Sequence, residues 1–121
     1  MNFVRSVLTN GHVRIGENDI DLSKKLGPDN LRKYEGKEIV FGFRPEAAVL
    51  RNEGECCSLK CTVELTELLG DNTNVYIDIQ GSKSILKVNP HDTPEMDSEL
   101  EFYIPYESIY LFDGETENVI K

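Results

Sequence analysis

The sequence has no tryptophan, two histidines and three cysteines in 121 residues. Histidine is the most common general acid or base at neutral pH. The two present, His12 and His91, lie far apart in the sequence, so they offer few candidates for acid–base catalysis. The cysteines Cys56, Cys57 and Cys61 are odd in number and close together, which indicates reduced thiols rather than a disulfide framework. A phosphate-binding loop ending in Lys-Ser/Thr is absent, as are the motifs GxGxxG, HExxH and GxSxG.

Basic residues are also scarce. Thirteen Lys and Arg face 22 Asp and Glu, for a formal net charge of −9, so the average surface repels nucleic-acid phosphates and anionic membranes. No run of 18 apolar residues is present to predict a transmembrane helix, and the beginning of the chain lacks the apolar region of a signal peptide. The length is that of one domain with a single modest core.

A short apolar run at residues 39–43 predicts a buried strand, because β-branched and aromatic residues suit a pleated surface. Pro45 ends this strand, since it has no N–H for the ladder, and it holds Arg44 extended. We expect the Arg44-Pro45-Glu46 corner to be either a strand end with a local ion pair or a place that holds a contact fixed. Residues 46–50 then form one helical turn or a second short strand.

Asn10-Gly11 predicts a hairpin between residues 3–9 and 12–15, because a type I′ turn needs positive φ at both central positions. This register pairs Thr9 with His12, Leu8 with Val13, and Ser6 with Ile15. Residues 28–34 predict a short helical turn, with Pro28 at its first position and Gly36 just past its end.

The clearest alternation of apolar and polar residues spans positions 57–65 and predicts a strand with one buried face. Its inward positions are Cys57, Leu59, Cys61, Val63 and Leu65. Further strands are expected at residues 75–79, 85–88, 100–104 and 109–112. Seven to nine short strands at this spacing indicate an all-β fold, either a small antiparallel barrel or a sandwich.

Three local patterns could carry a function, and each has a simpler explanation. The cysteines could bind a metal, but adjacent residues on a strand point to opposite faces, which favours buried hydrophobes. The turn Gly70–Thr73 could bind an oxyanion through backbone N–H groups, although such turns more often only join strands. Surface tyrosines could stack single-stranded nucleic acid, but the negative charge opposes this.

Four segments, taken in order, resemble one known family. Residues 43–46, Phe-Arg-Pro-Glu, are similar to the Ile-Arg-Pro-Glu segment in the C-terminal domain of maltose-type sugar-importer ABC ATPases. Residues 67–76 resemble that domain's Glu-x-Leu-Gly-x-Glu-Thr-x-Val-Tyr signature. Residues 111–116 resemble its closing Leu-Phe-Asp-x-Glu-Thr, and residues 1–3 its initial Met-Asn-Phe.

The resemblance implies that residues 1–121 are a single transport-associated OB-type (TOBE) domain, a small Greek-key barrel with a short helical turn. It implies a regulatory and dimerisation role, with no catalysis and no cofactor in this fragment. ATP and Mg would bind a nucleotide-binding domain that is absent here. The implied partners are a second copy, the subunit's own nucleotide-binding domain, membrane permease subunits through that domain, and a regulatory protein. Nucleic acid is not among them. The implied location is cytoplasmic, on the inner face of the membrane.

The resemblance also implies roles for individual residues. Arg44, Pro45 and Glu46 would shape the corner, and Gly70 would allow the turn before Thr73. Phe112 would anchor the last segment near the dimer contact, and Asp113 beside it is a further contact candidate. Two positions depart from the family pattern, with Ala47 in place of a common His and Asn72 in place of Glu. The alternatives are a module for a small, molybdate-like oxyanion and a single-strand nucleic-acid OB domain.

Overall fold

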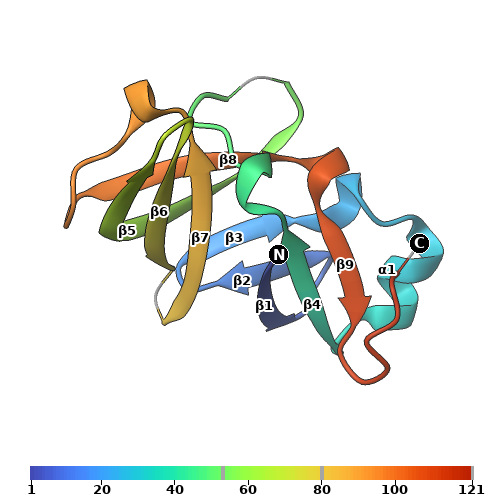
Figure 1. The fold of residues 1–121 in the computed structure, drawn as a ribbon. Coiled ribbons are helices and arrows are strands. Elements are labelled where there is room, and N and C mark those ends of the chain that lie inside the picture. Colours follow the sequence, from blue (N-terminus) through green and yellow to red (C-terminus); the bar gives the residue numbers. More distant parts are fainter. Residues whose placement is uncertain (53, 80, 121) are drawn as a thin grey trace.

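Strands dominate the computed structural model, which describes residues 1–52, 54–79 and 81–120 (Figure 1). In chain order the elements are β1 (Asn2–Val7), β2 (His12–Ile15), β3 (Asn18–Asp21), α1 (Pro28–Tyr34), β4 (Glu38–Phe43), β5 (Cys56–Leu69), β6 (Asn72–Ile79), β7 (Ser82–Val88), β8 (Glu99–Pro105) and β9 (Tyr110–Asp113). Short 3-10 turns lie at Leu22–Lys24, Pro45–Ala47, Pro90–Asp92 and Tyr106–Ser108.

The strands form two main sheets and a hairpin. One sheet has the order β7-β6-β5-β8, the other has the order β1-β4-β9, and β2 pairs with β3. In the first sheet three consecutive strands pair as neighbours and β8 returns beside β5, which is the Greek-key order. The predicted all-β, OB-like fold with a short helix is therefore confirmed.

Two asparagine side chains join the sheets by taking the place of a neighbouring strand. The Asn2 amide donates to the Ile85 carbonyl at 2.8 Å and accepts the Ile85 N–H at 2.9 Å. Asn18 makes the same pair of bonds with Lys60 of β5, at 3.1 and 2.8 Å. Each side chain thus satisfies a backbone donor and acceptor that would otherwise lack partners in the protein.

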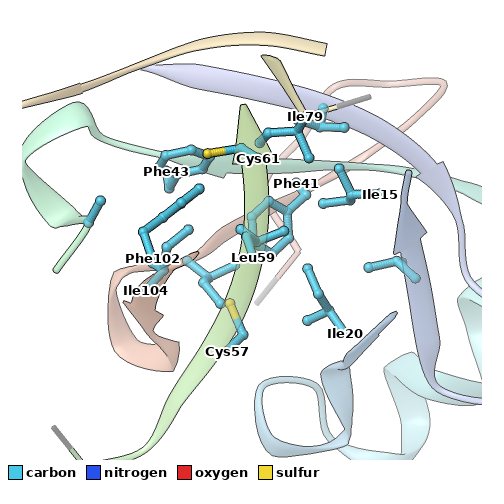
Figure 2. Packing of buried hydrophobic residues seen from close by; sticks show 14 of the residues in the cluster. Ile15, Ile20, Phe41, Phe43, Cys57, Leu59, Cys61, Ile79, Phe102 and Ile104 are labelled. Atoms are coloured by element: carbon cyan, nitrogen blue, oxygen red, sulfur yellow. The ribbon is translucent and has the colours of Figure 1, made fainter. Parts of the chain in front are cut away.

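The core fills the space between the sheets (Figure 2). Phe41 and Phe43 of β4 and Phe102 of β8 are fully buried, and their rings meet in sequence at centroid distances of 6.1 and 6.0 Å. The predicted inward residues of β6, namely Val75, Ile77 and Ile79, are at most 1% exposed, so the alternation there is confirmed.

The strand predicted at residues 39–43 is confirmed as β4, and it is buried on both faces. Ile39, Phe41 and Phe43 point into the core, while Val40 and Gly42 are covered from the other side. β4 also takes the central place in its sheet, with β1 paired to one edge and β9 to the other.

The Asn10-Gly11 turn is confirmed, but the predicted hairpin register beyond it is wrong. Asn10 and Gly11 have φ of 53° and 79°, and Thr9 and His12 exchange both backbone hydrogen bonds. Past this pair the strands separate, because β1 pairs with β4 and β2 with β3. Leu8 instead bonds to the chain entering β4, donating its N–H to the Lys37 carbonyl.

The prediction that Leu65 points inward is also wrong. The alternation holds from Cys57 to Val63, where each inward residue is at most 6% exposed, but Leu65 is 51% exposed. The register with β6 shifts between Val63, which faces Ile77, and Leu65, which faces Tyr76. A bulge of this kind places one extra residue in the strand, so the following side chains change face.

The helix predicted at residues 28–34 has those bounds in the structure. Pro28 occupies its first turn, Tyr34 is buried, and Gly36 follows with φ of 75°. Among the described residues, no helix is long and apolar enough to cross a bilayer.

Candidate functional site

The Arg44-Pro45-Glu46 corner follows β4 directly. Arg44 is extended, and Pro45 begins a 3-10 turn. Arg44 and Glu46 are exposed, and neither makes an ion pair within the described part of the chain. The guanidinium carbon instead lies 5.9 Å from the centroid of the Tyr110 ring in β9. The local ion pair expected at this corner is therefore replaced by a cation–π contact.

Phe112 of β9 lies across from Val40, on the outer side of the same sheet. Its ring meets that of Phe3 edge to face, with centroids 5.8 Å apart. Both rings lie over Gly42, where an added Cβ would come within 3.2–3.3 Å of Phe3, Phe112 and the Met1 sulfur. The two rings can therefore pack directly against the β4 backbone because position 42 has no side chain.

Together these residues form what we call the aromatic face, which comprises Met1, Phe3, Val7, Val40, Tyr110 and Phe112. The pairings Phe3–Gly42–Tyr110 and Arg5–Val40–Phe112 put its members on one side of β1, β4 and β9. Phe3 is 57% exposed and Tyr110 is 37% exposed. A hollow of about 380 Å³ opens between Phe3, Arg5, Val40, Phe112 and Glu117.

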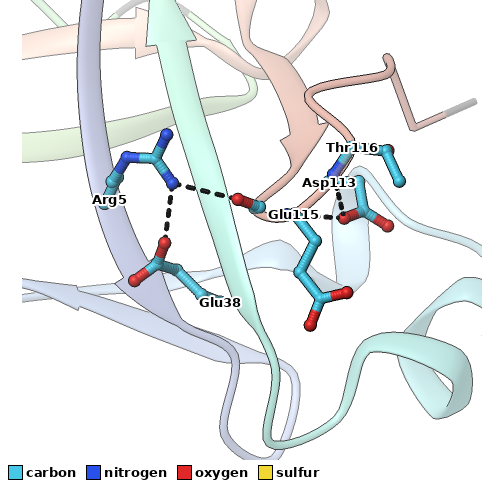
Figure 3. Close-up of polar contacts among 6 residues, drawn as sticks. Arg5, Glu38, Asp113, Glu115 and Thr116 are labelled. Carbon is cyan, nitrogen blue, oxygen red and sulfur yellow. Dashed lines mark hydrogen bonds and ion pairs between the residues drawn. The ribbon is translucent and has the colours of Figure 1, made fainter.

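A network of polar contacts holds the border of the aromatic face (Figure 3). The Arg5 guanidinium lies 2.7 Å from the Glu38 carboxylate and donates to the Gly114 carbonyl at 3.1 Å. A Cβ on Gly114 would collide with the carbonyl oxygen of Glu38, and the Gly114 N–H donates to that same oxygen. The chain after β9 is therefore held close against the beginning of β4.

Asp113 shapes this loop from its first residue. Its carboxylate accepts the N–H groups of Thr116 and Glu115 at 3.1 and 2.8 Å. These two backbone hydrogen bonds hold the pKa of Asp113 below its ordinary value of 3.8, because they stabilise the charged form. The Leu-Phe-Asp-x-Glu-Thr segment thus combines an aromatic residue of the face with a closed turn beside it.

Gly70 and Thr73 lie in the other sheet, away from these residues. Gly70 has φ of 65° at the first position of the two-residue turn between β5 and β6, as a type II′ turn requires. Thr73 is 1% exposed, and its hydroxyl oxygen lies 3.0 Å from that of Thr93. These contacts give both residues a structural role, and oxyanion binding at this turn remains a prediction.

Cys57 and Cys61 are buried, as the alternation predicted. Desolvation raises the pKa of each of these two thiols to about 12, so neither forms a thiolate at neutral pH. No group of three or more metal-ligating side chains is found among the described residues.

Sequence reasoning missed Gly42 and Tyr110, but it identified five residues of this region, namely Arg44, Pro45, Glu46, Phe112 and Asp113. It also treated Phe3 only as part of a motif. A usable signal was present, since Phe3 and Val7 occupy the outward half of the alternation in β1, where polar residues are usual. An apolar outward half indicates a second buried or contacting surface.

Comparison with known proteins identifies the class. The family model described as a TOBE domain matches residues 41–112, and the MalK OB fold domain matches residues 1–48. The chain therefore belongs to the TOBE domain family, as the four motifs predicted.

Individual relatives are ATP-binding proteins of importers. The chain is 28% identical to the oligosaccharides import ATP-binding protein MsmX of Bacillus subtilis over 97% of its own length and 33% of the relative's. It is 25% identical to the sulfoquinovosyl glycerol transport ATP-binding protein SmoE of Agrobacterium fabrum over 99% and 33% of the two chains. With UgpC of Chromobacterium violaceum, an sn-glycerol-3-phosphate import ATP-binding protein, identity is 34% over 71% and 23%. The chain thus spans about a third or less of the length of these curated relatives.

A solved structure has the same fold. The cytoplasmic molybdate-binding protein ModG, in a form with molybdate bound, superposes with a TM-score of 0.68 over 91% of this chain and 94% of that chain. Sequence identity is only 15%, so the likeness concerns the fold and carries no ligand.

Proposed function

We propose that the chain is the regulatory and dimerisation domain of the ATP-binding subunit of a carbohydrate ABC importer, without catalytic activity of its own. Its relatives' names describe ATP-binding subunits that import oligosaccharides or glycerol derivatives. In such a subunit ATP and Mg would bind the nucleotide-binding domain. This domain would instead bias the equilibrium between states of the ATPase pair, by contacts that differ between those states.

The proposal places the chain in a complex at the inner face of the membrane. Its partners would be a second copy of the subunit, the attached nucleotide-binding domain, the permease subunits through that domain, and a regulatory protein. Nucleic acid is not a proposed partner, because a net charge of −9 opposes phosphate binding.

The aromatic face is the main support for the proposed dimer contact. Arg5 and Arg44 lie at its border together with carboxylates such as Glu38 and Glu117, so both signs of charge are present there although the chain is strongly acidic. A two-fold contact needs one surface that complements itself. An apolar face with both signs at its border meets this need, and it avoids the repulsion between two acidic chains.

Light scattering across a concentration series tests this contact. The apparent mass should rise from 13.7 kDa toward double that value, and Phe3→Asp should abolish the rise by placing like charges in the contact. Met96→Asp is the matched control, since Met96 is 54% exposed, similar to Phe3 at 57%, and lies off the face. A wild-type chain that stays monomeric at ~1 mM would contradict the proposed contact, as would equal effects of the two substitutions.

The absence of catalysis is tested separately, by incubating the purified chain with ATP and Mg²⁺. Turnover that co-purifies with the folded chain would overturn the non-catalytic role. The two alternative functions remain predictions with direct tests. Calorimetry with molybdate or tungstate tests the oxyanion module, and a gel shift at low salt tests single-strand nucleic-acid binding.

A further inference from the structure

The second half of β5 has an open edge. β5 pairs with β8 only through residues 56–62, and at Val63 its edge meets the loop before β8, where the Asp97 N–H donates to the Val63 carbonyl. From Leu65 to Leu69 it pairs with β6 alone. No backbone hydrogen bond within the described ranges joins residues 65–69 to any other segment.

The turn at Gly70 determines which backbone groups face outward. In a hairpin with a two-residue turn, the flanking residues exchange both hydrogen bonds, and such pairs then alternate along the ladder. Leu69 pairs with Asn72, so Glu67 and Leu65 also bond toward β6. The N–H and C=O groups of Thr66 and Leu68 therefore point away from the sheet.

Apolar side chains accompany these unpaired backbone groups. Leu65, Leu68 and Leu69 are 51%, 69% and 51% exposed. Leu68 lies across from buried Thr73, whereas Leu65 lies across from Tyr76 on the opposite side of the sheet. Leucines therefore lie on both sides of this edge. Of the features that usually prevent strand addition, the edge has the bulge and the glutamates.

The charges near this edge are mostly negative, which restricts what can pair with it. Glu64 and Glu67 lie on the strand, and Glu95 and Asp97 lie on the loop that meets it at Val63. Lys83 contacts Glu64 at 2.7 Å, while Glu67 accepts the Tyr76 hydroxyl at 3.2 Å. Antiparallel pairing of two copies centred on this segment would bring Glu67 against Glu67, which is unfavourable.

We propose that residues 65–69 bind an extended segment of another protein, which adds to the sheet as a strand beside β5. Its backbone pairs with Thr66 and Leu68, its apolar side chains cover Leu68 on one face, and a Lys or Arg lies opposite Glu67 on the other face, with its methylene groups against Leu65 and Leu69. Main-chain bonds supply affinity in this mode and alternate side chains supply specificity. The site lies on the other sheet from the aromatic face and does not depend on the proposed dimer.

The test uses a blocked six-residue peptide that alternates valine and lysine, added to the isotope-labelled chain and followed by nuclear magnetic resonance. We expect shifts centred on residues 65–69 and slower hydrogen exchange at the Thr66 and Leu68 amides. Two matched peptides separate the causes, one with glutamate in place of lysine and one with alternate backbone amides methylated. Both should bind at least ~tenfold more weakly.

Variants of the chain provide the reciprocal test. Thr66→Pro removes an outward N–H without touching the β6 ladder and should abolish binding, while Thr66→Val keeps the N–H and should bind as the wild type does. If Thr66→Pro unfolds the hairpin, the methylated peptide still decides the question. Equal binding of all three peptides, or no change at residues 65–69, would overturn the proposal. Self-association that Thr66→Pro removes would also overturn it, since the occupant would then be a second copy.

Discussion

The molecule exposes apolar side chains in two regions that differ in their backbone pairing and in their local charge. The aromatic face lies on a sheet whose β9 edge is covered, because the chain after β9 returns to bond Leu111 and Asp113, and the Asn2 side chain of β1 bonds to Ile85 of the other sheet. In residues 65–69 the side chains are exposed and the backbone edge is open as well.

Charge separates the two regions further. Arg5 and Arg44 lie together with Glu38 and Glu117 beside the aromatic face, whereas glutamates predominate beside the open edge. The presence of exposed apolar side chains does not by itself distinguish the two regions. Backbone pairing and local charge are the observations that support the two proposals, a side-chain contact with a second copy at the aromatic face and a strand from a basic partner at residues 65–69.

The largest expected effect separates the two regions by packing. Gly42→Val should lower the free energy of unfolding by about 1–3 kcal/mol, because the new methyl groups overpack the space under Phe3 and Phe112. Leu68→Ser at the open edge should change it by less than about 0.5 kcal/mol, since Leu68 packs against little. Chemical denaturation measures both. Gly42→Ala should fall between wild type and Gly42→Val, and a larger loss for Leu68→Ser than for Gly42→Val would refute the distinction.

Local chemistry made much of this fold predictable from the sequence. The Asn10-Gly11 turn, the helix beginning at Pro28 and the buried β4 each depend on residues adjacent in the chain. The register errors arose where a distant partner decides the outcome. Ser6 pairs with Ile39 rather than Ile15 because β4 offers burial on both faces, and no pattern within β1 or β2 encodes that competition.

The candidate residues show the same limit. Asp113 could be placed in a turn from its neighbours Glu115 and Thr116, which are local. The contact of Arg44 with Tyr110 could not, since it depends on the pairing of Gly42 with Tyr110 across β4 and β9. The bulge after Val63 likewise left no signal in an alternation that continues unbroken through Leu65.

A smaller effect is expected at the Arg44 corner. An ion-paired guanidinium would contribute about 1–2 kcal/mol, but an exposed one over an aromatic ring contributes about 0.5–1 kcal/mol. Arg44→Ala should therefore lower stability by no more than about 1 kcal/mol. A double-mutant cycle with Tyr110→Leu tests the cause, because the coupling energy should account for most of the loss. Additive effects of the two substitutions would show that Arg44 acts through another group.

The smallest effect is electrostatic and compares one carboxylate beside each sheet. Backbone N–H groups lower the pKa of Asp113, and the Gly81 N–H and then Lys83 lower that of Asp78. Because each folded pKa lies below the unfolded value near 3.8, each charge stabilises the fold above that pH. The contribution is lost as pH falls through the folded pKa.

Asp113→Asn and Asp78→Asn should therefore reduce the free energy of unfolding more at pH 7 than at an acidic pH below the folded pKa, where the wild-type carboxylates are protonated. Added salt should weaken the Asp78 effect more, because Lys83 lies 3.3 Å away and screening acts on that ion pair. The Asp113 effect should change less, since neighbouring N–H groups provide most of its stabilisation. A loss from Asp113→Asn that is the same at both pH values would mean that the turn depends on the shape of the side chain and not on its charge.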